Sequence, residues 1–110
     1  MERLRIAVDD ADPQRPLVTL VGEMDLDGEP AARSLAERMR TQPEAEWRID
    51  LSGVTFVDSA GLRMLLVIRR ALDEDGTIVI VDPSPPVRSL LRMSKLDFFF
   101  AIDAEDEVGS

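Results

Sequence analysis

The sequence predicts a single α/β domain with a mixed sheet of four to five strands, packed by helices in the element order ββαβαβα. Short segments of alternating or continuous apolar residues, typical of strands, are separated by segments in which apolar residues recur every three or four positions, typical of helices. The 110 residues are enough for one domain with a hydrophobic core and too few for two. We find no internal repeat and no low-complexity linker.

The first half of the chain predicts a hairpin followed by a strand–helix–strand unit. Residues 3–8 alternate, a turn rich in Asp and Pro follows, and residues 17–22 form a second strand, which favours an antiparallel pair. A helix is expected from Pro30 to about Arg40. Its inward face would carry Ala32, Leu35, Ala36 and Met39. Trp47, Ile49 and Leu51 alternate in a third strand, which a right-handed crossover makes parallel to the second.

The second half predicts two further helices around an apolar strand. One helix would run to Leu72, with an apolar stripe made of Leu62, Leu65, Leu66, Ile68 and Leu72. The almost wholly apolar residues 77–81 are typical of a central parallel strand. A Pro-rich turn then leads to a helix with Val87, Leu90 and Leu91 inward. Residues 98–102 would form a last short strand or an apolar plug, before an acidic, solvated tail.

The junction between residues 54–57 and the helix from Leu62 is the strongest candidate site. Asp58 and Ser59 are both good N-cap residues, because their side-chain oxygens can accept hydrogen bonds from the first amides of a helix. A phosphate on Ser59 would lie at the positive end of the helix dipole, where free backbone amides would stabilise it. The structural alternative is that Asp58 and Ser59 only cap the helix and Gly61 only allows close packing.

The composition argues against several classes of function. The chain has no cysteine and no histidine, which excludes thiolate chemistry and a Ser-His-Asp arrangement, and a Ser-Lys variant would depend on Lys95 alone. We therefore expect no enzyme and no catalytic residue. A net charge of −9 is unfavourable for nucleic-acid binding. The acidic segment 23–28 resembles part of a calcium loop, but Ser34 stands where such a loop needs a bidentate glutamate, so no calcium site is expected. The acidic segment 73–76 is expected to be a solvated helix-to-strand turn rather than a metal site. No cofactor is expected.

The sequence contains no apolar run long enough to span a bilayer, and its first residues lack the hydrophobic core of a signal peptide. We expect a cytoplasmic protein without direct membrane insertion.

Four segments together resemble the STAS domains, typified by the bacterial anti-sigma factor antagonists. They are Gly22-Glu23-Met24-Asp25, Phe56-Val57-Asp58-Ser59-Ala60-Gly61-Leu62, the apolar strand ending before Pro83, and Pro86-Val87-Arg88-Ser89-Leu90-Leu91 with Leu96 behind it. The resemblance implies a STAS domain over residues 3–107, with a disordered end at residues 108–110. The Asp-Ser-x-Gly-Leu element is the most specific of the four.

The resemblance implies regulation of transcription by partner switching. The unphosphorylated protein would bind an anti-sigma factor, itself a serine kinase of ATPase fold, and so free a sigma factor. Phosphorylation at Ser59 would release the kinase, and a metal-dependent serine phosphatase would reverse it. The implied partner-binding residues are Asp25, Asp58, Ser59, Ala60, Gly61, Leu62, Arg63 and Met64, of which Arg63 and Met64 are expected to be exposed contacts. The oligomeric state is left open, with a homodimer as one option.

Two departures from the family pattern affect the expected partner surface. Gly28 stands where many members have a Ser or Thr that caps the first helix, which would leave Asp27 as the cap, and Lys95 replaces a common glycine. Two alternatives remain open: a STAS subunit of a membrane phospholipid-transport ABC complex, and a signalling scaffold that is not phosphorylated.

Overall fold

A computed structural model describes residues 3–73, 76–94 and 101–103 of the chain. The elements are β1 (Arg5–Asp9), β2 (Leu17–Met24), the 3-10 helix η1 (Leu26–Gly28), α1 (Glu29–Arg40), β3 (Glu46–Val57), α2 (Ser59–Arg69), β4 (Thr77–Val81), α3 (Pro85–Ser94) and β5 (Ala101–Asp103). This is the predicted order with a fifth strand added, and the α/β class is confirmed.

The five strands form one mixed sheet in the order β1-β2-β3-β4-β5. Strand β1 pairs with β2 in antiparallel orientation, as the short turn predicts, and all other neighbours are parallel. A last short strand is therefore present at Ala101–Asp103, whereas Phe98–Phe100, Lys95, Leu96 and the tail from residue 104 lie outside the described residues.

Strand β3 is one continuous strand of 12 residues, where the sequence suggests two separate apolar segments. Its pairing with β2 shifts register twice, between Thr19 and Val21 and between Gly22 and Glu23 of β2. Each irregularity inserts one residue and changes which side chains face the helices. The buried positions of β3 are accordingly Trp47, Ile49, Leu51 and then Val54, which is why simple alternation stops at Leu51.

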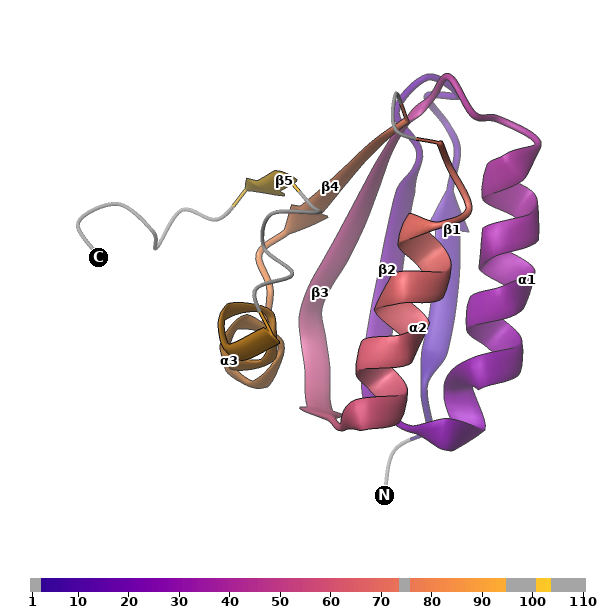
Figure 1. Ribbon diagram of the computed structural model, residues 1–110. Coiled ribbons are helices and arrows are strands. Elements are labelled where there is room, and N and C mark those ends of the chain that lie inside the picture. The colour runs from indigo at the N-terminus through magenta and orange to yellow at the C-terminus, as the bar shows by residue number, and fades with distance from the viewer. Residues whose placement is uncertain (1–2, 74–75, 95–100, 104–110) are drawn as a thin grey trace.

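The hydrophobic core lies between the sheet and its helices. Figure 1 shows α1 and α2 side by side, with α2 in front of β1 and β2 and α1 to the right of them, while α3 lies on the other side of β3. The amide of Ser84 donates to the carbonyl of Leu51 at 3.2 Å and joins the start of α3 to β3.

The predicted inward residues of α1 are all buried, as are Val87 and Leu91 of α3. Trp47 is fully buried and its indole Nε1 donates to the carbonyl of Gln42 at 3.0 Å.

Two helix boundaries differ from the prediction. Helix α2 begins at Ser59 and ends at Arg69, so that Leu72 is buried in the turn after the helix rather than within it. The amides of Arg70 and Ala71 donate to the carbonyls of Leu66 and Ile68, which tightens and ends the last turn. The N-cap of α1 is Gly28, without a side-chain hydrogen bond, so the prediction that Asp27 caps this helix is wrong.

Among the described residues, none of the helices has the length and apolar character needed to cross a membrane.

Candidate partner-binding surface

The predicted site residues gather at one end of the sheet, which we call the Ser59 edge. It consists of the carboxyl ends of β2 and β3, the 3-10 helix η1 and the first turn of α2. Met24 pairs with Val57, so that Asp25 and Asp58 follow directly after neighbouring parallel strands. The end of β3 and the start of α2 lie together at the bottom of Figure 1. The topology therefore places Asp25 and Ser59, which are 34 positions apart in the sequence, at the same edge of the sheet.

Asp58 is the residue that caps α2. It has extended backbone angles, with φ −122° and ψ −165°, and its Oδ1 accepts hydrogen bonds from the amides of Ala60 at 2.9 Å and Gly61 at 3.1 Å. The carbonyl of Asp58 accepts the amide of Leu62 at 2.9 Å, which closes the first helical turn. A carboxylate is favoured here because it satisfies donors that the helix leaves unpaired at its positive end.

The expectation of free amides at this helix end is wrong for Ala60 and Gly61, because both already donate to Asp58. A phosphate on Ser59 would stand beside the Asp58 carboxylate and would have to compete with it for these donors. Such a phosphate would therefore be poorly compensated within the chain itself.

Ser59 is the first residue of α2, and its side chain is exposed. Within the described part of the chain its hydroxyl makes no hydrogen bond, since Asp58 supplies the cap. The hydroxyl is thus not needed to stabilise the helix and is open to a second protein. Of the two residues in the structural alternative, Asp58 forms the cap at this junction and Ser59 does not.

Asp25 is half-buried and organises η1. Its side chain accepts the amide of Asp27 at 3.1 Å, and its carbonyl accepts the amide of Gly28 at 3.0 Å. The 3-10 helix contacts α2, because a Cβ built on Gly28 would stand 3.0 Å from Cε of Met64. Asp25 therefore holds the connection between β2 and α1 beside the start of α2.

Gly61 lets α2 approach the two strands closely. A Cβ at this position would stand 2.5 Å from the carbonyl oxygen of Met24 and equally close to Cγ2 of Val57. No side chain fits between the helix and the strand ends without moving backbone. The family resemblance implies that Gly61 sets the approach of the helix, and this lack of space gives a physical reason for it.

The remaining predicted contacts divide into accessible and buried residues. Arg63 is exposed, and Ala60 and Leu62 are half-buried at the surface of α2. Met64 has no exposed surface at all and belongs to the core, so the prediction that it is an exposed contact is wrong. It lies three residues after Gly61 on the helix, and one helical turn brings both onto the inward face.

Two exposed apolar residues at this edge were not among the predicted contacts. Leu26 in η1 is 63% exposed, and Phe56 near the end of β3 is 45% exposed. Val57 faces α2, since its Cγ2 lies beside the Gly61 position. Phe56 pairs with Glu23 and directly precedes Val57 in β3, so its side chain lies on the opposite face of the sheet, away from α2. An isolated leucine between two aspartates was the signal that could have marked Leu26.

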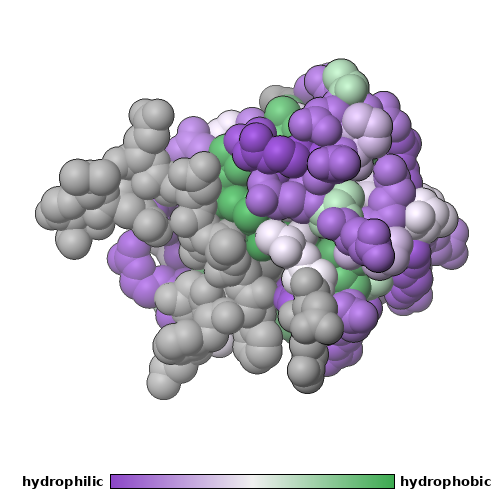
Figure 2. Space-filling model, turned by 90° about the horizontal axis from the view of Figure 1, so that it is seen from above, coloured by the Kyte–Doolittle hydropathy of each residue, from purple (hydrophilic) through white to green (hydrophobic). Residues whose placement is uncertain are grey.

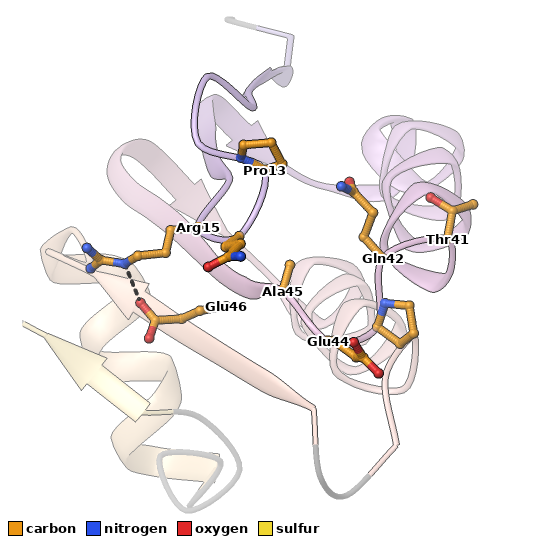
Figure 3. A pocket seen from close by; sticks show the side chains of 9 residues that line it. Pro13, Arg15, Thr41, Gln42, Glu44, Ala45 and Glu46 are labelled. Atoms are coloured by element: carbon orange, nitrogen blue, oxygen red, sulfur yellow. Dashed lines mark hydrogen bonds and ion pairs between the residues drawn. The ribbon is translucent and has the colours of Figure 1, made fainter.

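The opposite end of the molecule has a different character. Figure 2 looks onto this end, and hydrophilic residues cover most of the described surface there. Figure 3 shows a shallow hollow at this end between the β1–β2 turn and the α1–β3 connection, where Nε of Arg15 pairs with Oε2 of Glu46 at 3.1 Å. None of the predicted site residues lines it, so the candidate surface remains the Ser59 edge.

The fold and the Ser59 edge define a small α/β domain with a capped strand-to-helix junction on a mixed sheet. Residues 7–100 match the family described as "Mlab, STAS domain". A STAS-domain containing protein of Pseudomonas aeruginosa (strain UCBPP-PA14) is 32% identical over 97 residues, which cover 87% of this chain and 95% of that protein. The chain belongs to the STAS-domain family, as the four segments predict.

Three solved structures have the same fold. An anti-sigma factor antagonist from Mycobacterium paratuberculosis superposes with a TM-score of 0.79 at 26% identity, over 91% of this chain and 85% of that one. The anti-sigma factor antagonist SpoIIAA in its unphosphorylated form gives 0.73 at 22% identity, over 94% and 92% of the two chains. SpoIIAA of Bacillus in its phosphorylated form gives 0.69 at 21% identity, over 94% and 96%. At these last identities the likeness concerns the fold.

Proposed function

We propose that this chain is an anti-sigma factor antagonist that works by partner switching. In its unphosphorylated form it binds an anti-sigma factor serine kinase through the Ser59 edge and thereby frees a sigma factor. The chain is the substrate of the kinase and has no catalytic role of its own. The observation that carries the proposal is the Ser59 hydroxyl at the first position of α2. It is exposed and makes no hydrogen bond to any of the described residues, while Asp58 caps the helix.

The proposed modification is a simple phosphoryl transfer. The Ser59 oxygen attacks the γ-phosphorus of ATP held by the kinase, the bond to the β-phosphate oxygen breaks, and ADP and the hydroxyl proton are released. A metal-dependent serine phosphatase restores the hydroxyl by hydrolysis, with inorganic phosphate as the second product. The free hydroxyl suits this chemistry because no hydrogen bond within the described chain must break before it reacts.

The switch follows from charge and desolvation. A phosphate adds between about −1.5 and −2 charges at neutral pH. At Ser59 it would stand next to the Asp58 carboxylate, whose Oδ1 already holds the nearest amides. Bringing this charge into a contact with a protein costs desolvation energy that the partner must compensate. The complex therefore dissociates without any large change of fold.

A pull-down from lysate of the source organism tests this proposal, with the wild type, Ser59→Ala and Ser59→Asp as baits and mass spectrometry as readout. We expect the first two baits to recover a kinase of ATPase fold and Ser59→Asp to lose it, because the aspartate adds a charge at the contact. Equal recovery of the kinase by Ser59→Ala and Ser59→Asp would contradict the switch.

A second candidate function is a STAS subunit of a membrane phospholipid-transport complex that docks on an ATPase without phosphorylation. The Asp58 cap favours it, because the start of α2 is complete without a phosphate. In the same pull-down this function predicts that all three baits recover a transport ATPase. The identity of the recovered protein thus separates the two functions.

A further inference from the structure

We propose that Leu26 and Phe56 are the apolar anchors of the Ser59 edge, which bind an anti-sigma factor kinase whose contact surface has an apolar centre and a basic rim. This inference rests on the proposed function and specifies the chemistry of its partner.

Leu26 and Phe56 are two of the three strongly exposed large apolar side chains in the described part of the chain. Its strongly exposed large apolar residues are Leu26 at 63%, Phe56 at 45% and Met93 at 80%. Two of the three therefore belong to the Ser59 edge. Single exposed apolar residues are ordinary, but aromatic residues such as Phe56 are enriched at the centres of protein interfaces, and Leu26 adds apolar surface at the same edge.

The spacing allows one partner to cover both anchors together with Ser59. Phe56 precedes Ser59 by three residues, which limits their Cα distance to about 11 Å. Leu26 lies two residues beyond Met24, the partner of Val57 in the sheet, so its Cα is within about 20 Å of Ser59. A standard interface buries about 800 Å² on each partner, a patch roughly 30 Å across. Both anchors thus fit within one interface that includes Ser59.

The charged side chains near Leu26 and Phe56 indicate which charge the border of the partner's contact surface carries. Four carboxylates lie in the segments that carry the two apolar side chains, against the exposed cation Arg63 on α2: Glu23 is paired with Phe56, Asp25 and Asp27 flank Leu26, and Asp58 follows Val57. A basic rim would complement these groups, which remain partly hydrated at the border of a contact and guide association. The same carboxylates oppose a second copy of this chain or an anionic membrane surface, because either would bring like charges together.

The anchors also account for the effect of phosphate at this edge. A basic rim alone would attract a phosphorylated Ser59, whereas a dry centre between Leu26 and Phe56 would have to accept a dianion without water. Desolvation of such a charge outweighs its attraction to cations that lie at the hydrated border. With apolar anchors at the centre of the contact, a phosphate on Ser59 therefore leads to dissociation of the kinase.

Calorimetric titration of the purified kinase, once recovered and identified, tests the inference with wild type, Phe56→Ala, Leu26→Ala and Met93→Ala. We expect Phe56→Ala to raise the Kd at least about tenfold and Leu26→Ala at least about threefold, as for apolar residues at the centre of an interface. Met93→Ala, which removes an exposed apolar side chain from α3, should leave the Kd within about twofold of the wild type. Thermal unfolding of each variant serves as the folding control, since all three side chains are exposed.

The outcomes separate this inference from the function on which it rests. If wild type and Ser59→Ala bind the kinase but Phe56→Ala and Leu26→Ala bind as well as the wild type, the anchors are refuted and the switch stands. If Met93→Ala weakens binding as much as Phe56→Ala, the effect is not specific to the Ser59 edge and the anchors are again refuted. If the wild type binds no kinase, or if Ser59→Asp binds like Ser59→Ala, both the proposed function and the anchors fail.

Discussion

Replacement of Gly61 by alanine is expected to destabilise the domain, although alanine is the better helix former. The new Cβ would stand 2.5 Å from the Met24 carbonyl oxygen, where ordinary contact needs at least 3.4 Å. The helix start would have to move by roughly 0.9 Å, because the obstacle is backbone that is held in the β2–β3 pairing and cannot rotate away.

The magnitude follows from two opposing effects. Overpacking that forces such backbone shifts costs typically about 1–3 kcal/mol. The higher helix propensity of alanine returns about 0.5–1 kcal/mol. We therefore expect the free energy of unfolding to fall by about 1–2 kcal/mol, which corresponds to a decrease in Tm of roughly 4–8 °C for a domain of this size.

Urea unfolding followed by circular dichroism measures this change, with Gly53→Ala as the matched control. A Cβ on Gly53 would meet Cγ2 of Val21 at 3.0 Å, a side-chain methyl group that can shift by a few tenths of an ångström. Gly53→Ala should therefore cost clearly less than Gly61→Ala. A free energy of unfolding for Gly61→Ala within about 0.5 kcal/mol of the wild type would refute the close approach of α2 to the strand ends.

Three further predictions concern the same region and its opposite end. Asp58→Ala should lower the free energy of unfolding, measured in urea, by about 1 kcal/mol. Asp58→Asn should lower it by much less, because asparagine keeps the capping acceptor. Equal losses for the two variants would refute the cap. Met64→Ala should lower the free energy of unfolding by about 2–5 kcal/mol in the same assay, since the side chain is fully buried. Arg63→Ala should stay within about 0.5 kcal/mol of the wild type. An equally small loss for Met64→Ala would contradict its position in the core. Glu46→Gln, which removes the ion pair with Arg15 at the opposite end, should leave kinase capture in the pull-down unchanged, and a loss of capture would place the contact there instead.

Much of the fold was predictable because its helices and strands follow simple periodicities. The inward residues of α1 recur every three or four positions, and all four are buried as expected. Strand β3 was predicted as two separate segments, one ending at Leu51 and one at residues 54–57, because two register shifts against β2 interrupt the alternation and make Val54 the next buried position. Such irregularities depend on the neighbouring strand, which sequence periodicity does not include.

The strand-to-helix junction was predictable from the sequence, but the structural role of each of its residues was not. The Asp-Ser pair marked a helix start, yet only the geometry shows that Asp58 accepts the amides of Ala60 and Gly61 and that the Ser59 hydroxyl is not part of the cap. Met64 was misplaced because the apolar stripe was drawn through Leu62 and Leu66, whereas the buried face of α2 consists of Gly61, Met64, Leu65 and Ile68. Leu26 was overlooked because an apolar residue in a turn has no periodic pattern to mark it.

The affinity of the purified kinase for this protein, measured by calorimetry before and after incubation with ATP, tests partner switching most directly. We expect mass spectrometry to find one phosphate on Ser59 and calorimetry to show binding that is at least about tenfold weaker, a difference of about 1.4 kcal/mol. Ser59→Ala should take up no phosphate and keep its affinity. A protein phosphorylated elsewhere, or one that binds equally well with phosphate on Ser59, would contradict the account.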